Sequence, residues 1–167
     1  MAVAAALFAC APVPVAANPR DWDRASSIVR TGLVVVAVGV PAAKTDWTGL
    51  EQEALAMGAA GVVTGGLKLT VKEKRPDGSD ERSFPSGHTA ISFAAAAGLE
   101  QRYGWKIGVP AHLAAAFVGL ARVEADKHYV HDVLIGAAIG EIAGLLLVDK
   151  RHKNRGAPIG AGFRIAF

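Results

Sequence analysis

Long apolar stretches alternate with short polar segments along this chain. The lengths of the stretches, together with proline and capping residues at their borders, predict helices. The expected helices cover roughly residues 25–40, 48–74, 85–103, 109–123 and 130–148. Pro41 is expected to end the first helix, and Asp46 or Thr48 to cap the second. We interpret the polar segment before the first helix, Asn18–Arg24, as a linker or cap.

Small residues dominate the apolar stretches. Only 7% of the residues are aromatic, whereas the chain has 19 glycines and many alanines. This composition favours a helical bundle packed on small side chains over an aromatic-rich β-sandwich. The second predicted helix holds glycines at positions 58, 61, 65 and 66. Because each glycine costs a helix about 1 kcal/mol relative to alanine, we expect close backbone packing there.

Length and charge narrow the functional classes. A chain of 167 residues suits a single domain, expected over residues 18–167. The net charge of +3 is not gathered into a basic stripe with aromatic residues, so we expect no nucleic-acid partner. A single cysteine excludes an internal disulfide framework and a cysteine-based zinc site. The sequence does not predict an oligomeric state.

The N-terminus predicts export. No charged side chain occurs from Met1 to Pro19, and the apolar run Ala2–Ala11 is followed by the small residues Val15-Ala16-Ala17. Residues 1–17 therefore resemble a signal peptide, with an N-terminal anchor as the alternative because no Lys or Arg lies near Met1. Cys10 lies in a sequence similar to a lipidation box, although Phe8 is bulky for that motif. We expect a periplasmic or membrane-associated protein.

The charge-free runs are shorter than the roughly 20 residues that a membrane span needs. By this criterion the helices are expected to be buried in a compact domain. An integral membrane protein is the alternative, since the mean hydropathy of +0.30 is high.

Three clusters carry candidate chemistry. In the first, Lys68 and Arg75 precede Pro76 and lie seven residues apart, so two helical turns would place both on one face. Two cations there are suited to an anion, although a solvated basic face is the plainer explanation. In the second, the sequence Pro85-Ser86-Gly87-His88 opens a helix. Its free amides and helix dipole favour an anion, and His88 is placed to deliver a proton, although Ser86 is also an ordinary helix cap.

The third cluster is Arg122 with His128 and Asp132. A carboxylate four residues after a histidine can fix the imidazole tautomer and leave the other ring nitrogen free as a nucleophile. An exposed His–Asp contact without function is the alternative. His131 lies nearby, but we expect no metal site because no further ligand cluster completes a coordination shell with His128, His131 and Asp132.

In chain order these clusters resemble the three-part signature of the type 2 phosphatidic acid phosphatase and vanadium haloperoxidase superfamily. The resemblance covers about 65 residues, from Lys68 to Asp132, and the apolar helix that follows is also similar. It implies an all-α fold, a compact bundle of about five to six helices with the active site between helices. Ala121 departs from the family, in which a serine usually precedes the third-motif arginine. The acidic loop Asp77–Glu81 is expected to disfavour polyanionic substrates.

The resemblance also implies roles for these residues. Phosphate would be bound by Lys68, Arg75, Ser86, Gly87 and Arg122. His128 would attack phosphorus, Asp132 would orient it, and His88 would protonate the leaving alcohol and then activate water. The expected activity is a phosphomonoesterase without metal or other cofactor, acting on lipid phosphates such as phosphatidate-like or prenyl phosphates, or on small phosphate esters.

Two alternatives remain open from the sequence. A vanadate-dependent haloperoxidase would use the same oxyanion cradle, but such enzymes are typically much larger. A non-catalytic module that binds phosphate headgroups at a membrane is the other, although every reactive position of the signature is filled.

Overall fold

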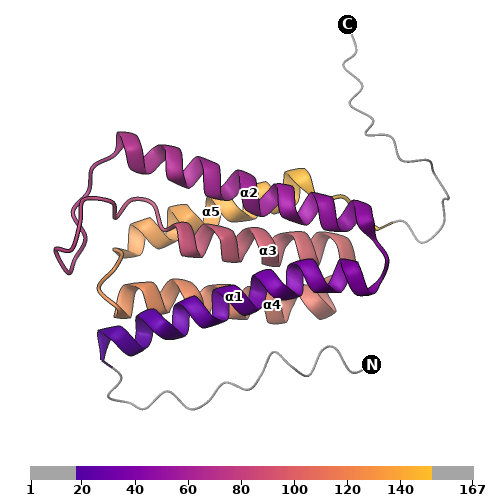
Figure 1. Cartoon of the computed structure of the whole chain (residues 1–167), viewed down its shortest axis with the longest axis horizontal. Coiled ribbons are helices and arrows are strands. Elements are labelled where there is room, and N and C mark those ends of the chain that lie inside the picture. The colour runs from indigo at the N-terminus through magenta and orange to yellow at the C-terminus, as the bar shows by residue number, and fades with distance from the viewer. Residues whose placement is uncertain (1–17, 152–167) are drawn as a thin grey trace, which may run out of the picture.

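In the part of the chain that the structure describes, five helices run up and down beside one another (Figure 1). The computed structural model describes residues 18–151, so the predicted signal peptide and Cys10 lie outside the described residues. The helices are α1 (Pro19–Ala43), α2 (Trp47–Thr70), α3 (Gly87–Tyr103), α4 (Trp105–Glu124) and α5 (Val130–Leu147). The central helix α3 buries a continuous alanine-rich stretch, 94–97, among the other four. The all-α fold expected from the sequence is confirmed in this part of the chain.

The borders of α1 differ from the predicted ones at both ends of the helix, and the difference at its start matters for the site. The Asn18 side chain accepts hydrogen bonds from the amides of Arg20 and Asp21, so α1 begins at Pro19 and the supposed linker is helical. Pro41 lies in the last turn of α1, and the helix continues past it to Ala43, two residues beyond the expected end at Pro41.

The second helix ends four residues earlier than expected, at Thr70. The chain after it turns back on itself, and the amide of Ser83 donates to the carbonyl of Glu73 at 2.9 Å. This pairing draws the segment away from helical geometry, so Arg75 lies in the α2–α3 loop. The expectation that Lys68 and Arg75 project from one helix face is therefore wrong.

Close glycine packing occurs on α5, but not at the four positions of α2 where it was predicted. At Gly58, Gly61, Gly65 and Gly66 an added Cβ would meet nothing within 4 Å, so the expected contacts there are absent. At Gly136, in contrast, a Cβ would lie 2.5 Å from the carbonyl oxygen of Ser86. The lack of a side chain thus brings α5 directly against the backbone of α3 where α3 begins.

Three described helices, α1, α4 and α5, are long and apolar enough to cross a membrane. Only 28%, 39% and 22% of their apolar windows are buried inside the bundle. Exposed side chains on them include Val35, Leu113, Leu120, Leu134 and Leu146. An apolar surface of this extent marks contact with lipid, and the protein is integral to the membrane or associated with it. The preference for buried helices is corrected: a charge at the border of a charge-free run does not end the helix, and α1, for example, includes Arg30.

Candidate active site

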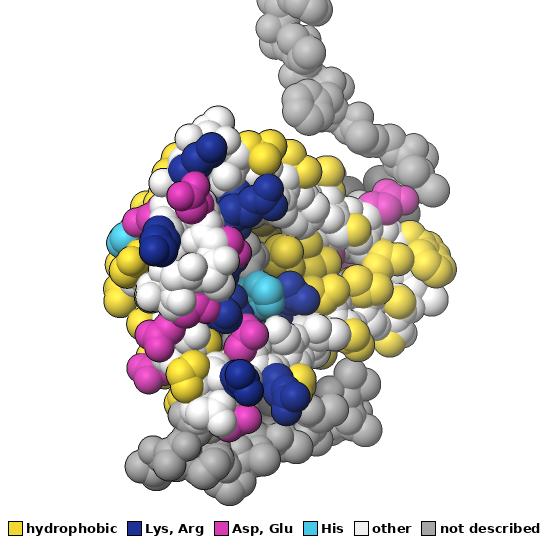
Figure 2. Space-filling model, turned by 60° about the vertical axis from the view of Figure 1, so that its left-hand side comes forward, with side chains coloured by type: hydrophobic (Ala, Val, Ile, Leu, Met, Phe, Trp, Pro, Cys, Tyr) yellow, Lys and Arg dark blue, Asp and Glu magenta, His cyan; other side chains and the backbone are white. Residues whose placement is uncertain are grey.

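The residues of all three sequence clusters lie at one end of the bundle. There α2 and α4 end, α3 and α5 begin, and the α2–α3 loop covers the tip (Figure 1). When this end is turned forward, a histidine and several Lys and Arg side chains gather in a hollow, beside hydrophobic flanks (Figure 2).

The centre of the arrangement is a buried histidine–aspartate pair. His128 is 3% exposed and Asp132 is fully buried, and His128 Nδ1 lies 3.3 Å from Asp132 Oδ2. His128 precedes α5, and its amide donates to the carbonyl of Arg122 at 3.2 Å, which holds the turn between α4 and α5. With Nδ1 directed at the carboxylate, the imidazole has Nε2 free for chemistry.

Positive charge surrounds this imidazole. Burial, followed by the charges of Arg122, Lys68 and Arg75, lowers the pKa of His128 to about 4, against the opposing effect of Asp132. The imidazole is therefore neutral at neutral pH, which is the form that can act as a nucleophile.

Lys68 and Arg75 reach the same backbone carbonyl from different segments. Lys68 Nζ donates to the carbonyl of Arg82 at 2.6 Å, and Arg75 Nη2 donates to it at 3.5 Å. Arg75 Nη1 also donates to the carbonyl of Lys127 at 3.3 Å, next to His128 in the chain. The fold thus brings the two cations together without the shared helix that the spacing suggested.

The third cation is held by α1. Arg122 is 4% exposed, and its Nη1 donates to Asp23 and, at 3.4 Å, to Ser26 Oγ. One turn along the same face of α1, Ser27 Oγ lies 3.4 Å from His88 Nε2. Sequence reasoning missed Asp23 because its segment was interpreted as a linker. Extending the helix to Pro19 would have placed Asp23, Ser26 and Ser27 on one face.

At the start of α3, Ser86 is the helix cap. Its Oγ lies 2.9 Å from Thr89 Oγ1, and its own amide donates to the carbonyl of Asp132 at 3.0 Å. The amides of Gly87 and His88 follow in the first turn, where a helix supplies no carbonyl acceptor of its own. This end of the helix is suited to an anion, with the Ser86 hydroxyl already engaged in capping.

The acidic loop is paired with cations. Asp77 lies 2.5 Å from Lys127 Nζ, and Asp80 Oδ1 lies 2.7 Å from Arg75 Nε. The hydrogen bond from Arg75 holds the pKa of Asp80 below its usual range, although burial opposes this shift. The loop therefore presents less free negative charge than the sequence suggested. Asp80 also binds the guanidinium of Arg75, which the sequence analysis expects to bind phosphate.

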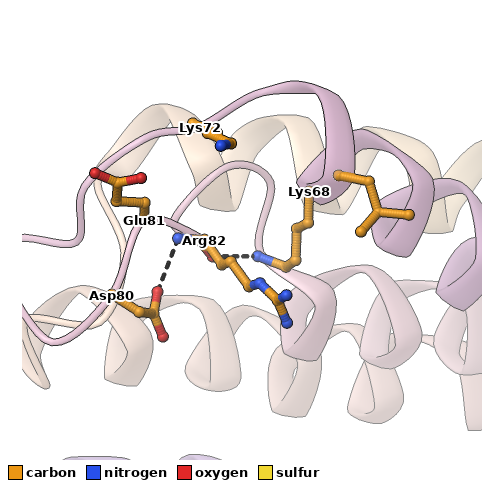
Figure 3. Close-up of a pocket in the computed structure, with 6 residues that line it drawn as sticks. Lys68, Lys72, Asp80, Glu81 and Arg82 are labelled. Carbon is orange, nitrogen blue, oxygen red and sulfur yellow. Dashed lines mark hydrogen bonds between the residues drawn. The ribbon is translucent and has the colours of Figure 1, made fainter.

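A surface pocket of 350 Å³ opens beside Lys68 (Figure 3). Its lining comes from the end of α2 and the α2–α3 loop, and consists of Lys68, Leu69, Lys72, Asp80, Glu81 and Arg82. In Figure 3, Lys68 extends from α2 to the Arg82 backbone at one side of this pocket. Lys68 therefore lines this pocket, but His128 does not.

Ser83 is a further residue that sequence reasoning missed. It is fully buried, and its Oγ donates to Asp132 Oδ2 at 2.5 Å. Its position three residues before Ser86 was the only available signal, because the contact spans 49 residues of sequence. The roles of the eight sequence-assigned residues remain predictions, which this geometry allows.

The chain is similar to a known protein family and to two named phosphatases. The PAP2 superfamily model matches residues 52–155. Lipid A 1-phosphatase of Porphyromonas gingivalis is 37% identical over 100 residues, covering 58% of this chain and 22% of that protein. Lipid phosphate phosphatase 1 of Arabidopsis thaliana is 33% identical over 141 residues, covering 75% of this chain and 41% of that protein. The chain thus spans less than half the length of these relatives.

Two solved structures share the fold. Aquifex aeolicus LpxE superposes with a TM-score of 0.66 at 25% identity, covering 77% of this chain and 83% of that chain. A transmembrane PAP2 type phosphatidylglycerolphosphate phosphatase from Bacillus subtilis superposes with a TM-score of 0.61 at 23% identity, covering 77% and 74%. At 23% identity, the similarity to the Bacillus subtilis structure shows a shared fold and no more.

Proposed function

Because the chain belongs to the PAP2 superfamily, we propose that it is a phosphatase that hydrolyses lipid phosphomonoesters without a metal cofactor. One observation carries the proposal: a buried, neutral His128 that is held by Asp132 and surrounded by the charges of Lys68, Arg75 and Arg122. Such a site stabilises the negative charge of a phosphoryl group in transfer and presents a nucleophile to it.

The proposed reaction has two steps. His128 Nε2 attacks phosphorus, the bond to the lipid oxygen breaks, and His88 gives its proton to the departing alkoxide. Burial and the charge of Arg122 lower the pKa of His88 to about 3 in the free protein, so His88 must take up that proton when the phosphate dianion binds beside it. Asp132 stabilises the cationic phosphohistidine through Nδ1–H. His88 then takes a proton from water, which attacks phosphorus, releases inorganic phosphate and restores His128.

The three cations and the α3 amides have a different task. In the proposed reaction, Lys68, Arg75 and Arg122 hold the non-bridging oxygens, and the Gly87 amide adds a neutral donor. Ser86 contributes by capping α3 and so directing these amides. Ala121 is fully buried beside Arg122, and the absence of a serine hydroxyl there removes one donor without removing charge.

A lipid substrate is supported by the apolar surface. A groove of 290 Å³ runs between α2 and α5, the helices that also supply Lys68 and Asp132. Its lining is entirely aliphatic: Ala59, Ala60, Val63, Ile139, Ile142, Ala143, Leu146 and Leu147. We propose that an acyl or prenyl chain lies there. The names of the relatives, which include lipid A 4'-phosphatase of Helicobacter pylori, support this substrate class.

The test is phosphate release by purified protein in lipid nanodiscs, with a chelator present and with phosphatidate or a prenyl phosphate as substrate. We expect His128→Ala to abolish turnover. We expect His88→Ala to slow it at least a hundredfold and to accumulate an acid-labile, base-stable phosphoenzyme. His112→Gln, a histidine on α4 outside the site, serves as the matched control. Near wild-type hydrolysis by the His128 variant would refute the mechanism.

A further inference from the structure

Asp132, which holds His128, also faces a second histidine, His131, and a second carboxylate, Glu73. His131 Nε2 lies 2.9 Å from Glu73 Oε1 and 3.2 Å from Asp132 Oδ1. Glu73 comes from the α2–α3 loop, whereas His131 and Asp132 form the first turn of α5. Sequence reasoning excluded a metal site because His131 and Asp132 lacked a further ligand. The fold supplies that ligand from 58 residues away.

The buried oxygens of this group are incompletely satisfied. Asp132 is fully buried, and its Oδ2 accepts from Ser83 and Tyr129. Its Oδ1 accepts no hydrogen bond among the described residues, because His131 Nε2 lies 3.2 Å away without the geometry of one. Glu73 Oε2 is also buried without a partner there. Glu73 is partly buried and Asp132 is fully buried, and a positive species between the two carboxylates would offset their repulsion.

We propose that Glu73, His131 and Asp132 bind a divalent transition-metal ion, with Zn²⁺ as the best match, and that the bound ion slows the phosphatase. One imidazole and two carboxylates are ligands typical of zinc, whereas Ca²⁺ and Mg²⁺ prefer sets of six or more oxygens. The three ligand atoms lie within 4.8 Å of one another.

The distances fit a tetrahedral ion. Metal–ligand bonds of about 2.1 Å place neighbouring ligand atoms about 3.4 Å apart. The two contacts of His131, at 2.9 and 3.2 Å, require only a few tenths of an ångström of expansion. The His131 side chain is 56% exposed, which gives an ion a route from solvent and leaves room for water as the fourth ligand.

The site is coupled to catalysis through the two oxygens of one carboxylate. Asp132 Oδ2 holds His128, so an ion on Oδ1 draws negative charge away from the imidazole. The cationic phosphohistidine would then be less stabilised, and kcat would fall. This coupling depends on the proposed function, whereas metal binding does not.

Binding is measured on tag-free protein in nanodiscs, stripped with a chelator and titrated with Zn²⁺ in competition with a chromogenic chelator, without substrate. We expect wild type to bind one more Zn²⁺ per chain than His131→Ala, and Glu73→Gln to weaken that site at least tenfold. Glu51→Gln, which removes an exposed carboxylate on α2, should bind as wild type does. Equal isotherms for all four proteins would overturn the proposal.

Inhibition is measured separately. Zn²⁺ should slow phosphate release by wild type and Glu51→Gln, the chelator should reverse this, and His131→Ala should need at least tenfold more Zn²⁺. Equal inhibition of wild type and His131→Ala would overturn the coupling to Asp132. If no protein hydrolysed any phosphomonoester, the proposed function would fail, and the binding isotherms would still decide the metal site.

Discussion

Ser83 Oγ lies 2.5 Å from Asp132 Oδ2, closer than His128 Nδ1, which lies 3.3 Å from the same oxygen. The serine therefore fixes the carboxylate, and the carboxylate in turn orients the histidine. Ser83 belongs to the α2–α3 loop, so this hydrogen bond ties the loop to α5 at the point where the proposed chemistry occurs. Ser83 is a positioning residue, because it acts on the reaction only through Asp132.

Ser83→Ala should lower kcat about tenfold with little change in KM. A hydrogen bond to a charged group contributes about 1.5–3 kcal/mol, and a loss of about 1.4 kcal/mol corresponds to a factor of ten. Ser92→Ala is the matched control, because Ser92 is equally buried and its hydroxyl has no partner among the described residues. An unchanged kcat for Ser83→Ala, or an equal loss in the control, would contradict this role.

The pH profile should have an unusually low acid limb. The pKa of His128 is lowered to about 4, so the imidazole stays neutral until the pH falls through that value, and protonation below it removes the nucleophile. Because kcat/KM reports the free enzyme, its acid limb should lie near pH 4 after correction for the phosphate ionisation near about 6. Arg75→Gln should move the limb to higher pH, and a wild-type limb near the ordinary histidine value would refute this assignment.

Asp80→Asn should strengthen substrate binding. Asp80 is half-exposed and holds Arg75 in an ion pair that phosphate must replace. Since exposed pairs contribute up to about 1 kcal/mol, KM should fall about two- to fivefold. Glu81→Gln removes a neighbouring charge on the same loop and should leave KM within twofold of the wild-type value. If the two variants lowered KM equally, loop charge in general would be responsible, not the contact with Arg75.

Ala143→Trp should separate long-chain from short-chain substrates. An indole at this position fills the groove between α2 and α5, so KM for a phosphatidate with long acyl chains should rise about tenfold. A water-soluble short-chain phosphate should be hydrolysed as before. Leu113→Trp places the same side chain on the exposed face of α4 as a control. Equal effects on both substrates would show that the groove does not hold the lipid chain.

The sequence predicted the helical fold and a gathering of reactive residues, because apolar periodicity and short motifs are local signals. Ser86 and Asp46 could be identified as caps for the same reason. The end of α2 could not, since it depends on the pairing of Glu73 with Ser83 across the loop. Asp23 was missed because its segment was taken for a linker.

Long-range partners were also beyond the sequence. Glu73 meets His131 only once the loop folds over α5. The glycines at positions 58, 61, 65 and 66 of α2 and those of α5 have similar sequence surroundings, yet among these only the α5 glycines lie against the backbone of α3. Which face a glycine occupies follows from how the helices pack, and the pattern of small residues alone does not determine it.

The contact at Gly136 controls how accurately the two halves of the proposed site are positioned. The α3 amides and the Asp132 carboxylate belong to separate helices, and the gap between those helices is set where Gly136 meets the Ser86 carbonyl. A single added methyl group would wedge the helices apart four residues from Asp132 and shift the proposed nucleophile relative to its anion cradle. The spacing between the nucleophile and the anion-binding amides thus depends on a glycine, Gly136, that has no proposed contact with phosphate.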